Sequence, residues 1–443
     1  MNSFTLTYFL AITNLIIIIF AFWLTLYPII TLLHLGLVGT FFAFTVRPIV
    51  DAAMNGHVLY PTNLGWNYYN LGLIYQLIFE ISFLIGYMIL RQKRNKNLQF
   101  EFSYKLKRGY LLSIFLGIIV VFIMAILSHG TWLASNRSVT ITSAVPFGKI
   151  LFPMSIISLS VSFPLAYLLS YKYSNFTFKL LLFVGSIISF LMLDLLYERG
   201  FVISGFILIL FFYEKLKRLK YRWLILFVFL GILLGTFLRP LALLLSGSVD
   251  IQSFNSPINS ILSFFTGANF DSADVWPVAM EYIKEKGLLF GSTFLNLPFT
   301  FLTPSIRHQY NLLLAVDRLN AFYWGNFYWL SNFGFNVSTP QEVIMNFGAS
   351  LLPVFGFIIG SMTSLFDKWL WKFNKINIFN VYLVAAIFES DGNLISGSIE
   401  WFVAFVLIGW FINLVSKILF ISRDIVQENH QLNFTFKERR TKN

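Results

Sequence analysis

The chain contains no cysteine and little charge, since Asp, Glu, Lys and Arg together make up only 12% of its 443 residues. The absence of cysteine excludes a disulfide framework and a thiolate metal site. The sequence also lacks a Gly-rich P-loop and a His-Glu-x-x-His motif, which argues against a nucleotide-driven pump and a zincin-type metal centre. We therefore expect neither a bound metal nor another cofactor.

Hydrophobic residues, in contrast, make up 57% of the chain. They occur in runs of about twenty, the length at which a helix crosses a hydrocarbon core of about 30 Å. Lipid offers no hydrogen-bond partner to the backbone, so such runs must be helical. The sequence predicts an all-α polytopic membrane protein with about eleven transmembrane helices, at residues 5–26, 28–44, 71–90, 110–127, 150–169, 180–197, 201–212, 223–238, 347–365, 376–388 and 399–420.

The formal net charge of +12 comes from 32 Lys and Arg residues, most of which lie in alternate short loops and in the tail. The positive-inside rule explains this alternation by placing those segments in the cytoplasm. Basic clusters next to spans also contact anionic lipid, so the charge does not require a nucleic-acid partner. The amino terminus is then outside and the carboxyl terminus inside, and the cytoplasmic basic loops are 91–108, 171–179 and 214–222.

These helices divide the chain into residues 1–245 with eight helices, a large extracytoplasmic loop at 246–345, residues 346–420 with three helices, and a cytoplasmic tail at 421–443. The loop mixes charged and aromatic residues, so we expect it to cover an active site. Within it, apolar residues recur at three-and-four spacing over 274–286, which predicts a helix along the membrane surface. Asp274 is expected to cap this helix, and a second short helix is expected at 311–321.

Four arginines lie at predicted outer helix ends or in the loop: Arg199, Arg239, Arg307 and Arg318. Charge close to the bilayer usually faces a protein interior or a watery cavity. A guanidinium suits bidentate capture of phosphate oxygens, so these arginines predict a pyrophosphate-bearing ligand whose lipid part stays in the bilayer. Alternatively, Arg199 forms a salt bridge with Glu198 and Arg239 reaches the interface with its long side chain.

A general base for a hydroxyl could come from His308 or from the predicted outer carboxylates. These are Asp271, Asp274, Glu281, Glu342, Glu389, Asp391 and Glu400. The loop aromatics Tyr323, Trp324 and Trp329 have two explanations. They belong either to the aromatic belt of a membrane interface or to a surface on which sugar rings stack.

Three motifs within this organisation resemble the Wzy-type polymerases of bacterial surface polysaccharides. They are Glu342-Val-Ile-Met-Asn346-Phe347-Gly348 before an apolar helix, Glu198-Arg199-Gly200 in a short hairpin, and Glu389-Ser-Asp391-Gly392 in a late outer turn. Some members of the family also carry an Arg followed eleven residues later by Gly. That spacing is absent here, because Arg318 stands eleven residues after Arg307 and Trp329 eleven after Arg318.

The resemblance implies a GT-C-like fold in the bacterial inner membrane. It implies transfer of a growing glycan from undecaprenyl pyrophosphate to a sugar hydroxyl on a new lipid-linked repeat unit. Glu342, Asp391 and His308 are then the catalytic candidates, and the four arginines stabilise the departing pyrophosphate. The implied partners are the lipid-linked donor and acceptor, membrane lipids, a chain-length regulator and a flippase.

Two other functions fit the same features. An O-antigen ligase uses the same donor but transfers to a lipid A core. A lipid-linked oligosaccharide flippase or another transporter belongs to a different class; transporters place charge at mid-membrane and keep their outer loops short. This sequence has the reverse pattern, which favours the polymerase over the transporter.

Overall fold

The computed structural model describes residues 3–25, 30–54, 59–91, 101–103, 105–128, 148–196, 199–217, 219, 268–299, 302, 304–331, 334–335, 337–391 and 398–418. Eight helices in these ranges are long and apolar enough to cross a membrane, so the prediction of an all-α polytopic membrane protein is confirmed. The predicted helix at 223–238, the loop residues 246–267 and the tail at 421–443 lie outside the described residues.

The helices before the loop are α1 (Ser3–Leu24), α2 (Leu32–Phe41), the π-helix η1 (Phe42–Val46), α3 (Arg47–Ala53), α4 (Trp66–Leu90), α5 (Leu106–Leu127), α7 (Gly148–Lys172), α8 (Phe176–Leu195) and α9 (Arg199–Leu216). After the loop come η6 (Ala349–Leu351), α18 (Leu352–Lys372), α19 (Ile378–Asp391) and α20 (Ser398–Ile418). Two short strands, β1 (Glu101–Phe102) and β2 (Lys375–Ile376), pair in parallel.

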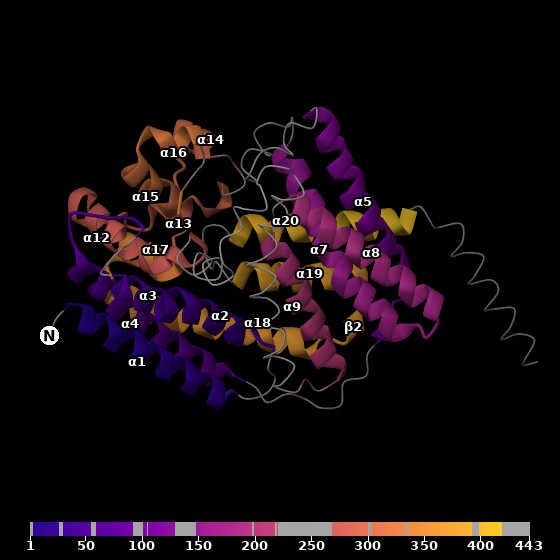
Figure 1. The fold of residues 1–443 in the computed structure, drawn as a ribbon, viewed down its shortest axis with the longest axis horizontal. Coiled ribbons are helices and arrows are strands. Elements are labelled where there is room, and N and C mark those ends of the chain that lie inside the picture. Colours follow the sequence, from indigo (N-terminus) through magenta and orange to yellow (C-terminus); the bar gives the residue numbers. More distant parts are fainter. Residues whose placement is uncertain are drawn as a thin grey trace, which may run out of the picture.

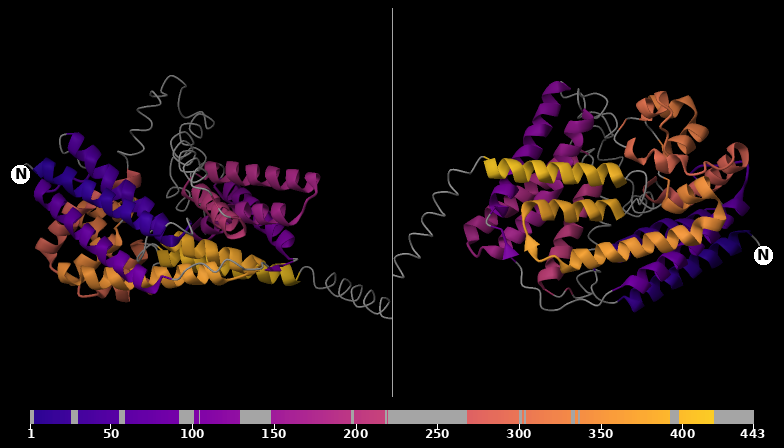
Figure 2. Two further views of the ribbon diagram at one scale, coloured as in Figure 1. Left: turned by 90° about the horizontal axis from the view of Figure 1, so that it is seen from below. Right: turned by 180° about the vertical axis from the view of Figure 1, so that it is seen from behind.

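These helices form two groups (Figures 1 and 2). Helices α1 to α4 and the first half of α18 make one group, and α5, α7, α8, α9, α19 and α20 make the other. Helix α18 joins the two groups. Its residues Leu352 and Ile359 pack into the hydrophobic core of the α1–α4 group, whereas Leu370 and Trp371 pack into the core of the other group.

Close packing of α18 on α4 depends on glycine. Gly356 and Gly360 form a Gly-x-x-x-Gly motif on α18, and Gly86 lies on α4. A Cβ atom on Gly360 would lie 1.9 Å from the carbonyl oxygen of Phe83, and one on Gly86 would lie 2.1 Å from that of Phe357. The two backbones therefore approach more closely than any larger residue allows, as small residues permit in membrane bundles.

The basic segments meet at one end of the molecule. Arg91 donates to the Leu24 carbonyl over 2.7 Å, Lys172 to that of Ser103 over 3.5 Å, and Lys215 to that of Leu370. Strand β2 follows α18 in the chain, and its partner β1 lies beside it at this same end. The alternation of basic loops along the sequence thus corresponds to one basic pole in space.

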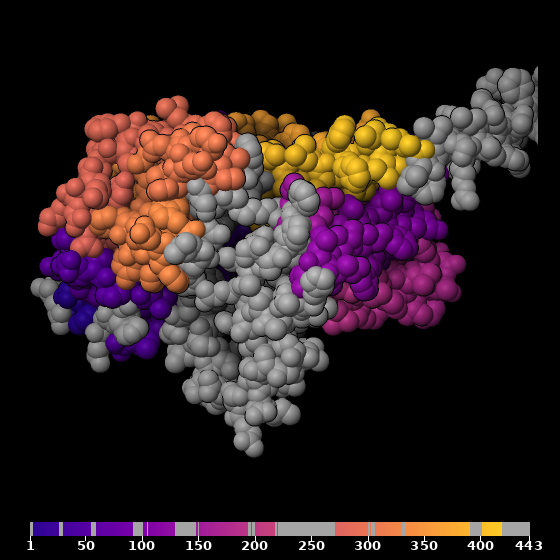
Figure 3. Space-filling model, turned by 90° about the horizontal axis from the view of Figure 1, so that it is seen from above, coloured from indigo at the N-terminus to yellow at the C-terminus, as the bar shows by residue number. Residues whose placement is uncertain are grey.

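Described loop residues form a small helical domain, here called the loop domain (residues 268–347), at the opposite end of α4 and α18 (Figures 1 and 3). It contains η4 (Ala268–Ala273), α12 (Val275–Lys286), α13 (Ser292–Leu295), η5 (Leu297–Phe299), α14 (Pro304–Gln309), α15 (Ala315–Trp324), α16 (Asn326–Ser331) and α17 (Thr339–Phe347).

Helix α12 confirms the helix expected at 274–286, but its apolar face packs inside the protein. The ring of Trp276 lies over Gly72 of α4, where an added Cβ would be 2.3 Å from the ring. The second helix begins at Ala315 rather than at 311, because Asn311 has a φ of 53° and Asp317 accepts the amide of Leu314.

The second predicted helix continues beyond its predicted end. The sequence predicted an end at 44, whereas the structure continues the helix through η1 to Ala53. The continuation is stable because Arg47 and Asp51, one turn apart, form an ion pair of 2.9 Å inside the protein. Paired in this way, the two charges do not end the helix.

Candidate functional site

Glu342 lies in α17, the last helix of the loop domain and the one that leads into α18. The helix begins after Ser338, whose backbone amide donates to the Gln341 side chain over 2.8 Å. This hydrogen bond at the start of the helix fixes the first turn. The Glu342 side chain points inward, and the residue is only 1% exposed.

Two polar side chains, those of Thr293 and Asn346, lie beside Glu342. The hydroxyl of Thr293, from α13, donates to Glu342 Oε1 over 3.3 Å. Asn346, one helical turn further on, donates from Nδ2 to Thr293 Oγ1 over 2.7 Å and to the Glu342 carbonyl over 2.8 Å. The Glu and Asn of the motif at 342–348 therefore share one threonine, which the sequence analysis did not single out.

Burial raises the pKa of Glu342 from 4.5 to about 7, and the hydrogen bond from Thr293 lowers it by less. No described cation contributes to this shift. A carboxyl with a pKa near neutrality exchanges its proton at physiological pH, which is the property required of a general acid or base. The described group that donates a hydrogen bond to this carboxyl is the hydroxyl of Thr293.

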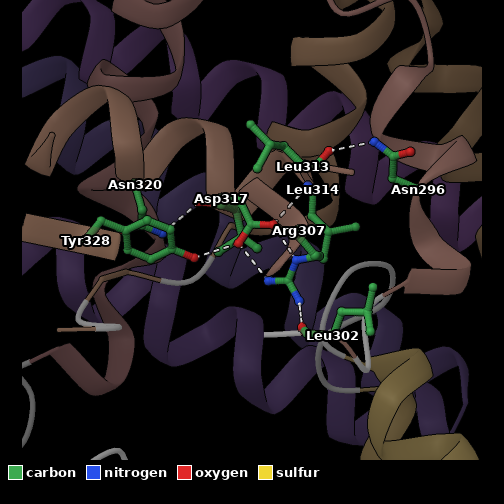
Figure 4. A network of polar contacts seen from close by, with 9 residues as sticks. Asn296, Leu302, Arg307, Leu313, Leu314, Asp317, Asn320 and Tyr328 are labelled. Atoms are coloured by element: carbon green, nitrogen blue, oxygen red, sulfur yellow. Dashed lines mark hydrogen bonds and ion pairs between the residues drawn. The ribbon is translucent and has the colours of Figure 1, made fainter. Parts of the chain in front are cut away.

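Arg307 is held inside the loop domain by Asp317 (Figure 4). Its Nε and Nη2 atoms donate to the two Asp317 oxygens over 2.6 and 2.7 Å, and its Nη1 donates to the Leu302 carbonyl. Tyr328 donates to the same carboxylate over 2.7 Å. All three nitrogens of the guanidinium are engaged, so this arginine holds α14, α15 and α16 together.

Arg318 follows Asp317 on α15, and its contacts differ from those of Arg307. It is partly exposed, its Nε is buried without a hydrogen-bond partner, and it forms no ion pair with another described residue. Helix α15 packs on α17 through Ala315, Leu319 and Met345, which share one hydrophobic cluster. The structure thus brings the helices of Arg318 and Glu342 together.

Two of the other arginines and one carboxylate cannot be placed in this site. Arg199 begins α9 and Asp391 ends α19, but their side chains lie outside the described part of the structure. Arg239 lies outside the described residues altogether.

The remaining predicted residues form two aromatic groups. His308 is exposed, and its ring centre lies 4.2 Å from that of Trp329. Tyr323 and Trp324 instead pack around Tyr60, at ring-centre distances of 5.8 and 6.2 Å. The aromatics expected to bind sugar are therefore divided between two places on the loop domain.

A buried polar network, which we call the Arg47 network, joins the loop domain to the transmembrane helices. It consists of Arg47, Asp51, Tyr60, Tyr69, Asp271 and Asp274. Arg47 donates to Asp274 over 2.6 Å and pairs with Asp51, which accepts the Tyr69 hydroxyl over 2.9 Å. Asp274 occupies the N-cap position of α12, as the sequence predicted, but its side chain makes no capping hydrogen bond and instead accepts the amide of Leu59 over 2.9 Å.

Asp271 belongs to the same network and accepts the hydroxyl of Tyr60. Burial raises the pKa of Asp271 to about 6, although the hydrogen bond from Tyr60 lowers it. This network was not predicted from the sequence, because the second predicted helix ended at 44, before Arg47. The four-residue spacing of Arg47 and Asp51 beside an apolar run was the available signal.

Within the described residues, no group of three or more His, Asp or Glu side chains is arranged to hold a metal ion. Comparisons of the chain with protein-family models, with curated proteins and with solved structures find no match.

Proposed function

We propose that the protein is a polymerase of lipid-linked oligosaccharide repeat units at the outer face of the bacterial cytoplasmic membrane. The observation that carries the proposal is Glu342, a buried carboxyl with a pKa of about 7 in the helix that leads into a membrane span. A base of this strength suits the removal of a proton from a sugar hydroxyl. A site next to a span suits substrates whose lipid part remains in the bilayer.

In this proposal the acceptor sugar hydroxyl takes the place of the Thr293 hydroxyl beside Glu342. The hydroxyl oxygen forms a bond to the anomeric carbon of the donor glycan while its proton passes to the Glu342 carboxylate. The bond between that carbon and the pyrophosphate oxygen breaks, and undecaprenyl pyrophosphate leaves as an anion. Release of the pyrophosphate then requires a positive group that is not already neutralised.

Arg318 is the arginine of the loop domain that supports this role, since the guanidinium of Arg307 is occupied by Asp317. A fixed guanidinium stabilises charge that develops on a leaving phosphate. Loss of one such donor typically lowers the rate by about 10²–10³-fold. Arg199 and Arg239 remain candidates for the same role on the basis of the sequence.

The test uses purified protein in liposomes supplied with a lipid-linked repeat unit. We expect the wild type to produce a ladder of lengthening glycans on polyprenyl pyrophosphate, and Glu342→Gln to lower the rate by about 10²–10⁴-fold. Glu285→Gln, an exposed carboxylate on α12, is the matched control and should retain the wild-type ladder.

Other outcomes would contradict the proposal. Movement of the lipid-linked unit across the bilayer without bond formation indicates a flippase. Product formation only after addition of lipid A core indicates a ligase. An unchanged ladder from Glu342→Gln excludes Glu342 as the base.

A further inference from the structure

The loop domain carries two large apolar side chains that are almost fully exposed. Phe290 is 82% exposed and Leu295 is 79% exposed, and both belong to the segment 288–295, which we call the apolar tip. Burying a large apolar side chain of this kind stabilises a protein, whereas exposing it to water is unfavourable. Two such residues on one short segment of a folded domain indicate a surface that contacts something apolar.

The apolar tip has a fixed and strained backbone. Phe290 has a φ of 48°, a left-handed conformation that is unfavourable for an L-residue other than glycine. Two hydrogen bonds hold the segment in place: the amides of Leu289 and Phe290 donate to the carbonyls of Met345 and Asn346, each over 2.9 Å. The outward direction of the Phe290 ring is therefore imposed by the contact with α17.

The apolar tip lies beside the first turns of the membrane span α18. The ring of Phe294 is 5.7 Å from that of Phe355, and Phe347 lies 5.1 Å from the same ring. This start of the span is exposed at Leu351 of η6 and at Val354, Phe357 and Ile358 of α18. The tip therefore belongs to a segment that packs beside the exposed apolar surface at the start of this span.

We propose that the apolar tip inserts into the leaflet of the bilayer next to the loop domain, with Phe290 and Leu295 in contact with lipid acyl chains. The continuity with α18 identifies lipid as the occupant, since the same surface already faces hydrocarbon along that helix. Transfer of both side chains from water outweighs the backbone strain at Phe290. Insertion holds α13, and with it Thr293, at the lipid surface whether or not the protein is a polymerase.

The absence of cysteine in the chain makes a direct test possible. Single variants Phe290→Cys and Leu295→Cys are labelled with an environment-sensitive fluorophore in the full-length protein. The proteins are placed in phosphatidylethanolamine–phosphatidylglycerol vesicles at a low protein-to-lipid ratio. Quenching is then measured with lipids spin-labelled on the acyl chain and with iodide in the aqueous phase. Gln309→Cys, on an exposed position of α14, is the matched control.

We expect labels at 290 and 295 to be quenched several-fold more strongly by the spin-labelled lipid than the label at 309, and several-fold less by iodide. Iodide quenching equal to that at 309 would place the tip in water and overturn the proposal. Protection from both quenchers would also overturn it, because a second copy or another protein would then cover the tip.

A second variant tests the role of Phe290 separately. Phe290→Gly removes the ring and relieves the positive φ, so the thermal stability in detergent should not fall. With the label at 295, we expect quenching by the spin-labelled lipid to weaken in this variant. Full lipid quenching at 295 would show that Phe290 does not help to anchor the tip.

Discussion

Burial of Glu342 makes the stability of the protein depend on pH. The pKa of this carboxyl rises from 4.5 to about 7 on folding, so between these values the folded state binds more protons than the unfolded state. Its contribution to the free energy of unfolding therefore falls as pH rises from about 4.5 to about 7, and is constant above that range.

Glu342→Gln should remove this dependence. At pH 8 we expect the variant to be more stable than the wild type by on the order of 2 kcal/mol, because it no longer buries a carboxylate. At pH 4 the two proteins should unfold at nearly the same temperature. Thermal unfolding in detergent at the two pH values measures the difference; equal wild-type and variant stability at pH 8 would argue against a raised pKa.

Catalysis should have the opposite pH dependence, since the proposed base must be ionised. We expect the rate of glycan extension at saturating substrate to rise with pH and to reach half of its maximum near pH 7. A rate that is constant between pH 5 and pH 8, measured with the same lipid-linked substrate, would exclude Glu342 from proton transfer.

The two loop arginines, Arg307 on α14 and Arg318 on α15, can be compared directly. Arg307→Ala leaves Asp317 buried without its cation and should destabilise the loop domain by about 3–5 kcal/mol. Arg318→Ala breaks no ion pair between described residues and should change stability by no more than about 0.5 kcal/mol, while it lowers polymer formation. Unfolding curves and polymer ladders of the two variants separate a structural arginine from a functional one.

The sequence predicted that arginines of the loop are important, but not which of them are engaged within the fold. Arg307 and Asp317 are ten residues apart and belong to different helices, so no helical periodicity relates them. Glu342 and Asn346 were found through a motif. Thr293 lies forty-nine residues from Glu342, and no local pattern marks it as a partner.

At the scale of helices, the apolar runs were sufficient to predict most of the transmembrane elements, because a span requires a minimum length of apolar sequence. The error at Arg47 arose because charged residues usually end such runs, whereas here Arg47 and Asp51 pair with each other and with Asp274. The partner in the loop domain is far away in the chain, so its effect on α3 was not predictable locally.

The glycines between α4 and α18 provide a test at this scale. Gly360→Ala should force the two helices apart, because the new Cβ would lie 1.9 Å from the Phe83 carbonyl oxygen. We expect a loss of several kcal/mol or failure to accumulate in the membrane, measured by thermal unfolding in detergent and by immunoblot. Gly36→Ala on α2, where nothing lies within 4 Å, should be neutral or slightly stabilising.

For the whole molecule, the Arg47 network decides how firmly the loop domain is attached. Arg47→Met leaves two buried carboxyl groups, Asp51 and Asp274, without their cation. We expect a cost of about 3–5 kcal/mol and faster proteolysis within residues 268–347 than in the wild type. Adding Asp274→Asn should recover part of this loss, since one uncompensated charge is then removed; no recovery would argue against the ion pair.

The pairing of α4 with α18 also sets the order in which the protein assembles during its synthesis. Both helices contribute to one packed backbone interface, yet α18 is translated long after α4. At about 5–20 residues per second, the roughly 260 residues between Leu90 and Leu352 take on the order of 10–50 s to translate. Throughout that interval the face of α4 around Gly86 has no α18 to pack against, so the pairing of these two helices is a late step of assembly.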